Sequence, residues 1–237
     1  MFWGIFLYVC FCFTLGVNGS EYNGGKVIEL NHKNNILLRG VINQQRASHV
    51  IHEINRRENK SELYLILDTP GGDVTHGMQI IGEVQSHNLN CIVQKAYSMG
   101  FAILQACNKR YLLPFGSVMQ HQISMGIQGE LGKIKSYVSL VTQYQSYLVD
   151  LQAQRINVTS DQFIRNTDND WWLFGKNAIL ENVGDEVVTM KCTSNLTKRN
   201  ISITNGGFEF IYSACPLITK ELEKRKTNNN IDTIFYL

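Results

Sequence analysis

The sequence predicts an α/β fold in which helices cover a sheet, followed by a small C-terminal appendage. Strand-like and helix-like stretches alternate along most of the 237 residues. The run Leu63-Tyr-Leu-Ile-Leu67 is wholly apolar and is bounded by turns, as expected of a buried parallel strand. From Gly129 to Arg155, apolar residues recur at helical spacing without a proline, which predicts one long amphipathic helix.

Composition supports a folded chain and excludes several classes of function. Hydrophobic residues make up 44% of the chain, which is ample for a core and excludes wholesale disorder. The formal net charge is only +2, so nothing in the electrostatics favours a nucleic-acid partner. No Cys-x-x-Cys or His-x-x-x-His spacing indicates a metal site. We therefore expect no metal, no cofactor and no nucleic acid.

The first segment resembles a secretory signal. Residues 1–17 are apolar and uncharged, and polarity changes abruptly over 18–21. Val17 and Gly19 are small enough to precede a signal-peptidase cut before Ser20, so residues 1–19 are predicted to be a signal peptide. An uncleaved membrane anchor is the alternative, although about 17 apolar residues is the short limit for a span. We expect a secreted or extracytoplasmic protein, with membrane anchoring as the second choice.

Four cysteines remain after such a cleavage. Cys192 and Cys215 flank one small C-terminal segment and make the better disulfide pair. Cys91 and Cys107 lie in apolar surroundings, where buried free thiols are at least as well supported. Asn-x-Ser/Thr acceptors fit a eukaryotic secretory route without demonstrating it; they occur at Asn59, Asn157, Asn195 and Asn200.

In the first half of the chain, the pattern predicts short elements separated by clear breaks. Alternation over 26–40 predicts strands. Helical spacing predicts helices at 44–57 and 74–85, and small apolar residues predict a buried helix over 98–106. The strand at 63–67 ends at Thr69-Pro-Gly-Gly72, which breaks the chain. Further short strands are predicted at 91–93, 110–113 and 117–119.

The second half begins with the long helix and changes character after Val188. A second helix is predicted from about Ser160 to Asn166, with a good N-cap. Asn205-Gly206-Gly207 separates two β-prone runs, which predicts a hairpin. We interpret residues 20–188 as the main domain. Residues 189–237 form an appendage closed by the Cys192–Cys215 pair, and the tail from Thr227 is expected to be loose.

Three side chains could form a nucleophile, base and orienting acid. Ser98 lies at a strand-to-helix turn, His121 follows a short strand, and Asp170 follows the long helix. Imidazole can take a serine proton near neutral pH, and a carboxylate can fix its tautomer. Gly71-Gly72 could present backbone N–H groups to an oxyanion, since no Cβ blocks the approach. The Gly-x-Ser-x-Gly turn of α/β-hydrolases is absent.

From about Asn35 to Val188, four sequence blocks resemble the Clp protease proteolytic subunit, a serine peptidase of the Clp/crotonase superfamily. Asp68-Thr-Pro-Gly-Gly-Asp-Val-Thr-His-Gly77 is similar to the family's Ser-Pro-Gly-Gly-x-Val-x-x-Gly block. Ala96-Tyr-Ser-Met-Gly-Phe-Ala102 resembles its nucleophile block, and Met119-Gln-His-Gln122 its base block. Arg165-Asn-Thr-Asp-Asn-Asp170 resembles its Arg-Asp-x-x-x-Asp block and ends 49 residues past His121.

This resemblance implies a fold, an activity and an assembly. The fold would be the Clp/crotonase-type repeated β-β-α spiral with a long handle helix. Ser98 would be the nucleophile, His121 the base and Asp170 the orienting acid. The backbone N–H groups of Gly72 and Met99 would form the oxyanion hole. The substrate would be a polypeptide or peptide, cut inside the ring of a homo-oligomer.

The chain also departs from the family pattern. Asn169 stands where the family has an arginine that pairs two rings, and Ile123 replaces a proline. A double ring is therefore in doubt, and an ATPase partner is not expected outside the cytosol, where ATP is scarce.

Three other functions stay open. The chain could be a catalytically silent scaffold of the same fold, with an appendage that binds a partner. It could be a crotonase-type hydratase, although nothing in the sequence indicates a CoA site. It could also be a serine–lysine peptidase, for which Lys95 is the nearest lysine in sequence to Ser98, although Lys95 is expected to point away from it.

Overall fold

A computed structural model of the chain describes residues 25–205, 207–226 and 234–236. The predicted signal peptide lies outside the described residues. Within them, no helix combines the length and the apolar character that crossing a membrane requires.

The predicted α/β fold is confirmed, and its centre is one mixed sheet. Five strands are hydrogen-bonded in the order β2-β3-β4-β5-β6. The first four are parallel and β6 runs antiparallel to β5, while the short β7 pairs with β5 in parallel. The bounds are β2 (Asn35–Arg39), β3 (Tyr64–Thr69), β4 (Asn90–Tyr97), β5 (Arg110–Gln120), β6 (Trp171–Phe174) and β7 (Glu186–Val187).

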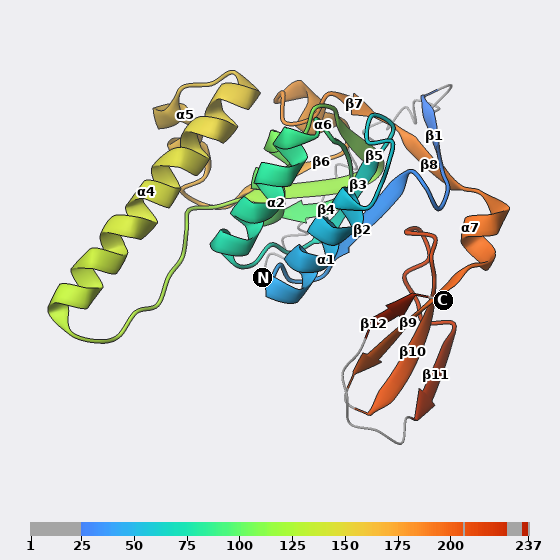
Figure 1. Cartoon of the computed structure of the whole chain (residues 1–237). Helices are drawn as coiled ribbons and strands as arrows, with labels where there is room; N and C mark the ends of the chain where they lie inside the picture. The colour runs from blue at the N-terminus through green and yellow to red at the C-terminus, as the bar shows by residue number, and fades with distance from the viewer. Residues whose placement is uncertain (1–24, 206, 227–233, 237) are drawn as a thin grey trace, which may run out of the picture.

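Three helices pack on one face of this sheet (Figure 1). They are α1 (Gln44–Asn55), α2 (Val74–Ser86) and α3 (Met99–Ala106). Asn43 and Asp73 cap α1 and α2, because their side chains accept the N–H groups of Arg46 and His76. Each helix turns its apolar positions toward the strands, as Ile54 and Ile81 show with at most 1% exposure. This packing forms the main core.

β5 differs from the prediction of two short strands. It runs without a break from Arg110 to Gln120, and the register against β4 jumps from Val93–Leu112 to Lys95–Ser117. The residues between these pairs form a bulge, which accommodates Pro114 without a ladder hydrogen bond from its nitrogen. β6 and the helix after it, α6 (Lys176–Leu180), were not predicted at all.

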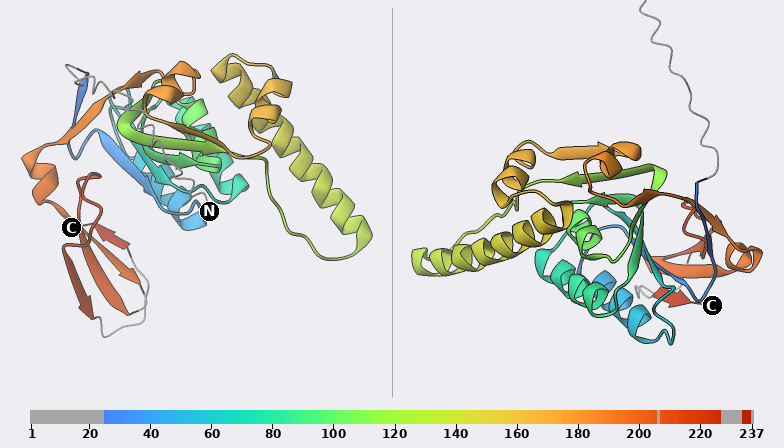
Figure 2. Two further views of the ribbon diagram at one scale, coloured as in Figure 1. Left: turned by 180° about the vertical axis from the view of Figure 1, so that it is seen from behind. Right: turned by 90° about the horizontal axis from the view of Figure 1, so that it is seen from above.

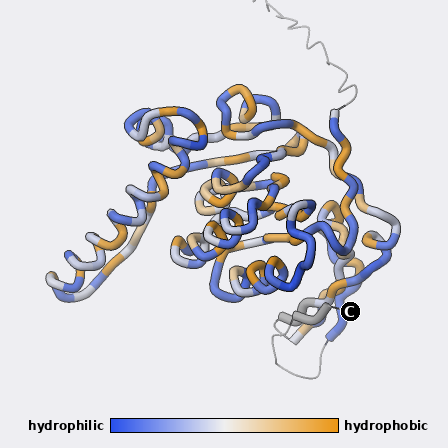
Figure 3. Tube along the Cα trace, turned by 45° about the horizontal axis from the view of Figure 1, so that its top comes forward, coloured by the Kyte–Doolittle hydropathy of each residue, from blue (hydrophilic) through white to orange (hydrophobic). Residues whose placement is uncertain are grey.

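A long helix extends away from the sheet (Figures 1 and 2). α4 (Leu131–Ile156) ends at Asn157, whose left-handed backbone (φ 66°) terminates it, and is followed by α5 (Ser160–Asn166). Hydrophobic and hydrophilic positions alternate along α4 (Figure 3). At its outer part Tyr137 and Val138 are exposed, whereas Leu148 is buried in the main core.

Two further strands cover the opposite face of the sheet. β1 (Val27–Leu30) pairs in parallel with β8 (Thr189–Cys192), and both pack on the sheet through a second apolar cluster. β8 therefore belongs structurally with the main domain, although it follows residue 188. The short α7 (Ser194–Lys198) and the residues around Cys215 complete this layer.

The C-terminal residues form a separate sheet of four strands in the order β11-β10-β9-β12 (Figure 1). β9 and β10 are the antiparallel pair at the expected hairpin, and residues 234–236 form β12, which pairs with β9. Gly206 and residues 227–233 lie outside the described part of the chain. The bounds are β9 (Asn200–Asn205), β10 (Phe208–Ser213), β11 (Glu223–Lys226) and β12 (Ile234–Tyr236).

Both cysteine pairs are joined. The Cys192–Cys215 disulfide links β8 to the segment after β10. Cys91 and Cys107 also form a disulfide, whereas their apolar surroundings in the sequence support free thiols at least as well. The reason lies in the fold. Cys107 ends α3 beside the start of β4, so the two Cα atoms are 5.9 Å apart, within the range that a disulfide spans.

Candidate active site

Ser98 occupies a strained turn between β4 and α3. Its backbone has φ 52° and ψ −118°, a region that residues with a Cβ rarely adopt. Its N–H donates to the carbonyl of Met119 on β5 over 2.8 Å, which holds the turn against the sheet. Although Ser98 is the N-cap of α3, its side chain makes no capping hydrogen bond. The hydroxyl is therefore left for another partner.

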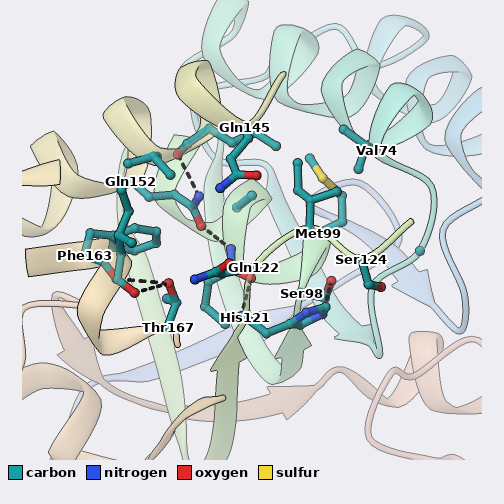
Figure 4. A pocket seen from close by; sticks show the side chains of 17 residues that line it. Val74, Ser98, Met99, His121, Gln122, Ser124, Gln145, Gln152, Phe163 and Thr167 are labelled. Carbon is teal, nitrogen blue, oxygen red and sulfur yellow. Dashed lines mark hydrogen bonds between the residues drawn. The ribbon is translucent and has the colours of Figure 1, made fainter. Parts of the chain in front are cut away.

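That partner is His121. The Nε2 atom of His121 lies 2.9 Å from Ser98 Oγ (Figure 4). His121 directly follows β5, and its backbone N–H donates to the side-chain Oε1 of Gln120 over 3.0 Å. Neighbouring parallel strands thus deliver the serine and the histidine to the same edge of the sheet.

The carboxylate of Asp170 is not joined to this pair. Its side chain is exposed and makes no hydrogen bond with any residue that the structure describes. The two residues nevertheless adjoin a paired position of the sheet, because β5 and β6 pair Gln120 with Trp171, the neighbours of His121 and Asp170 in the chain. Another carboxylate, that of Asp168, accepts from Gln122 over 2.6 Å. The structure therefore brings Ser98 and His121 into contact, and the carboxylate of Asp170 forms no hydrogen bond with His121.

The N–H groups of Gly72 and Met99 are available to a ligand. Gly72 follows β3 with φ 151°, and a Cβ there would lie 2.3 Å from the carbonyl oxygen of Ile42, so only glycine fits. Hydrogen bonds from Ile42 to Gly71 and from Asp73 to Ile42 fix this loop. Met99 is the first residue of α3, so its N–H has no acceptor within the helix. Among the described residues, neither N–H group has an acceptor.

A single pocket contains all four of these residues (Figure 4). Ser98, His121, Gly72 and Met99 lie at one end, and α4 and α5 form the other. The remaining lining residues are Val74, Ala102, Gln120, Gln122, Ile123, Ser124, Gln145, Leu148, Val149, Gln152, Phe163, Ile164 and Thr167. A nucleophile, a base and two free N–H donors around one pocket can carry out acyl transfer.

Sequence reasoning missed the four glutamines of this pocket, Gln120, Gln122, Gln145 and Gln152. Gln120 directly precedes His121, and Gln145 and Gln152 lie seven residues apart on α4. That spacing puts Gln145 and Gln152 on one helix face, a signal that was present in the sequence. Their contact with Gln120 could not have been read there, because it crosses between distant elements.

The serine–lysine alternative finds no support in the geometry. Lys95 points to the other face of the sheet, where its Nζ lies 3.5 Å from Asp68 Oδ1. Asp68 also binds Arg39 over 2.7 Å. In the described part of the chain, no group of histidine, cysteine and acidic side chains is arranged to hold a metal ion.

The buried Arg110 pairs with the partly exposed Asp185 and contacts α3. Arg110, with 1% exposure, donates to Asp185 Oδ1 over 2.6 Å and to Gln105 Oε1 on α3 over 2.7 Å. Burial alone would raise the pKa of Asp185, but the hydrogen bonds from Arg110 and the charges of Arg110 and Arg155 outweigh it, and the pKa is lowered. This network fixes the helix whose first residues carry Ser98 and Met99.

The chain is similar in sequence to known proteins of one family. The sequence profile described as Clp protease matches residues 20–191. The ATP-dependent Clp protease proteolytic subunit 2 of Tropheryma whipplei (strain Twist) is 28% identical over 141 residues, covering 57% of this chain and 78% of that protein. The corresponding subunit 1 of Borreliella burgdorferi (strain ATCC 35210 / DSM 4680 / CIP 102532 / B31) is 26% identical over 162 residues, covering 65% and 83%. The chain therefore belongs to the Clp protease family.

Proposed function

We propose that the protein is a serine endopeptidase that hydrolyses peptide bonds through an acyl-enzyme on Ser98. The observation that carries the proposal is the 2.9 Å contact between Ser98 Oγ and His121 Nε2. Membership of a peptidase family and the two free N–H groups beside Ser98 add support.

The reaction follows from the positions of these groups. His121 Nε2 takes the proton of Ser98 as Oγ attacks the peptide carbonyl carbon. The N–H groups of Gly72 and Met99 donate to the oxygen, which becomes negatively charged. His121 then returns the proton to the leaving amine as the C–N bond breaks. Water, deprotonated by His121, attacks the ester and releases the acid product and free Ser98.

Asp170 is the proposed orienting acid. It directly precedes Trp171, which pairs with Gln120 next to His121, and a rotation of its exposed side chain would bring the carboxylate toward Nδ1. The carboxylate of Asp168, the other acid nearby, already accepts a hydrogen bond from Gln122. Replacing Asp170 by asparagine should lower kcat about 10³- to 10⁴-fold, because the imidazole then loses the carboxylate that fixes its tautomer. The matched change Asp168→Asn should cost less than about fivefold, by the size of one neutral hydrogen bond.

Assembly and location are parts of the same proposal. Exposed apolar side chains on α4, such as Tyr137 and Val138, support association into a homo-oligomeric ring that encloses the serines. Two disulfides support an oxidising, extracytoplasmic location. ATP is scarce in such a compartment, so we propose that hydrolysis does not depend on ATP.

The test is cleavage of an unfolded protein by purified chain without ATP. Densely dye-labelled casein should become fluorescent with the wild-type protein and not with Ser98→Ala or His121→Ala. Light scattering on the same samples measures whether the active species is an oligomer.

Cleavage that persists in Ser98→Ala would contradict the assignment of the nucleophile. Absence of cleavage by a folded, oligomeric wild-type protein would favour the alternative of a catalytically silent scaffold. The exposed, unbonded carboxylate of Asp170 is the observation that keeps this alternative in view.

A further inference from the structure

The pocket beside Ser98 is lined by an unusual set of polar side chains. Four of them are amides: Gln120, Gln122, Gln145 and Gln152. Gln122 is already hydrogen-bonded to Asp168. No aspartate, glutamate, lysine or arginine lines it among the described residues. The walls between the amides are apolar, formed by Met99, Ala102, Leu148, Val149 and Phe163. The pocket therefore offers hydrogen bonds without offering a charge.

Two of the amides are buried and joined in a row that ends at the histidine (Figure 4). Gln152 Nε2 donates to the carbonyl of Leu148 over 2.7 Å, and Gln120 Nε2 donates to Gln152 Oε1. Gln120 Oε1 in turn accepts the N–H of His121. The exposures of Gln120 and Gln152 are 6% and 2%. Each amide nitrogen carries two hydrogens, so both side chains keep one that no described residue accepts.

The amide of Gln145 differs from this buried pair. Gln145 is half-buried, points into the pocket, and forms no hydrogen bond with the described residues (Figure 4). It lies on the α4 face that also presents Leu148, Val149 and Gln152. An amide that has no hydrogen-bond partner among the described residues supplies both a donor and an acceptor at the wall of the pocket.

We propose, building on the peptidase function above, that this pocket receives the side chain on the acyl side of the cleaved bond and selects glutamine. The oxygen of the attacked carbonyl faces Gly72 and Met99, and the leaving amine must face His121. The acyl-side residue then extends along Met99 and Ala102 toward α4. Its amide would meet the free hydrogens of Gln120 and Gln152 and both polar groups of Gln145.

The same chemistry disfavours the nearest competitors. Methionine matches glutamine in length but makes none of these hydrogen bonds. Glutamate would enter a buried site without a cation to balance its charge. When an apolar residue binds, the hydrogen bonds within the buried pair stay in place. The preference for glutamine over methionine should therefore be about threefold to tenfold, as one or two neutral hydrogen bonds give.

Binding to the Ser98→Ala protein tests this without requiring turnover. Fluorescent product-like peptides Ala-Ala-Ala-X, with X as Gln, Met or Glu, are titrated by fluorescence polarisation. The glutamine peptide should bind threefold to tenfold tighter than the methionine peptide, and the glutamate peptide weakest. Adding Gln145→Met should reduce the difference between glutamine and methionine, because only the hydrogens of Gln120 and Gln152 remain to bind the amide. The matched control Gln143→Met, on an exposed residue of the same helix, should preserve it.

The inference is overturned if methionine binds as tightly as glutamine, if no peptide binds, or if Gln145→Met leaves the preference intact. Gln145→Ala serves as a second variant should methionine disturb folding. Wild-type cleavage of casein reports on the proposed function separately. Cleavage without a glutamine preference would reject the inference alone, whereas a glutamine preference without cleavage would reject the peptidase.

Discussion

Two turns of this molecule have the same backbone and different residues. Ser98 joins β4 to α3 with φ 52° and ψ −118°, and Gly175 joins β6 to α6 with φ 50° and ψ −123°. Each N–H donates over 2.8 Å to a carbonyl of the strand between them, Met119 for Ser98 and Gly116 for Gly175. Glycine adopts this conformation freely, whereas serine is strained in it.

The two turns differ in what their residues supply. At Gly175 the chain needs only the sharp change of direction, and a Cβ would lie 2.6 Å from the carbonyl oxygen of Pro114. At Ser98 the chain accepts the strain and gains a hydroxyl directed at His121. Backbone strain that glycine would relieve is retained where a side chain reacts.

The largest expected effect separates the two turns by activity. Ser98→Ala should lower kcat/KM for peptide hydrolysis about 10⁴-fold or more, because it removes the nucleophile. Gly175→Ala, assayed at a temperature where it is folded, should keep kcat within about threefold, by the small effect expected of a change outside the reacting groups. Initial rates at several substrate concentrations measure both. Similar losses in the two variants would break the comparison.

The next effect concerns the ion pair between Arg110 on β5 and Asp185, which directly precedes β7. Asp185→Asn should lower the free energy of unfolding by about 3–5 kcal/mol, because it leaves the buried Arg110 without its carboxylate. Denaturant unfolding followed by circular dichroism measures this value. A loss below about 1 kcal/mol would mean that the pair contributes no more than an exposed one.

The same pair predicts a pH dependence. The folded protein lowers the pKa of Asp185, so its contribution to stability is present above the unfolded pKa of about 3.9 and is lost as pH falls through the lower folded value. The stability difference between wild type and Asp185→Asn should therefore shrink on acidification below about pH 4. Unfolding curves between neutral pH and pH 2.5 check this. A difference that grows on acidification would have the wrong sign.

A smaller effect tests the glycine turn itself. Gly175→Ala should destabilise the fold by about 2–4 kcal/mol, from a strained backbone and the close approach to Pro114. The midpoint of denaturant unfolding measures it. If alanine is tolerated within about 0.5 kcal/mol, the turn does not require glycine.

The smallest expected effect comes from replacing Ser98, the residue at the other turn, by glycine. Ser98→Gly should be more stable than Ser98→Ala by about 1 kcal/mol, because both lack the hydroxyl and only glycine relieves the strain. The two free energies of unfolding are compared directly. If Ser98→Ala is the more stable, Ser98 is not strained and the comparison fails.

Local patterns predicted the helices and the buried strands because amphipathic spacing is visible within one segment. Four-residue β6 and five-residue α6 are too short to show a period, so both were missed. The Cys91–Cys107 bond depends on where α3 returns to the sheet, which no local pattern reveals.

The candidate site also contains residues that could be predicted from the sequence and contacts that could not. Ser98 and His121 could be predicted from their motif blocks, and the structure sets them in contact. The role of Asp170 depends on a side-chain rotation that neither the sequence nor the register fixes. The contact between Gln120 and Gln152 joins β5 to α4 and depends on tertiary packing alone.

The most direct test of the account is whether the strained serine is activated. The chain from Ser20 to Leu237, without the predicted signal peptide, is treated with a fluorophosphonate probe, and the modified residue is located by mass spectrometry of its peptides. The account predicts one modified site, Ser98, with no labelling of Ser98→Ala or Ser98→Gly and slow labelling of His121→Ala. Absence of labelling in a folded wild-type protein, or equal labelling of the Ser98 variants, would contradict it.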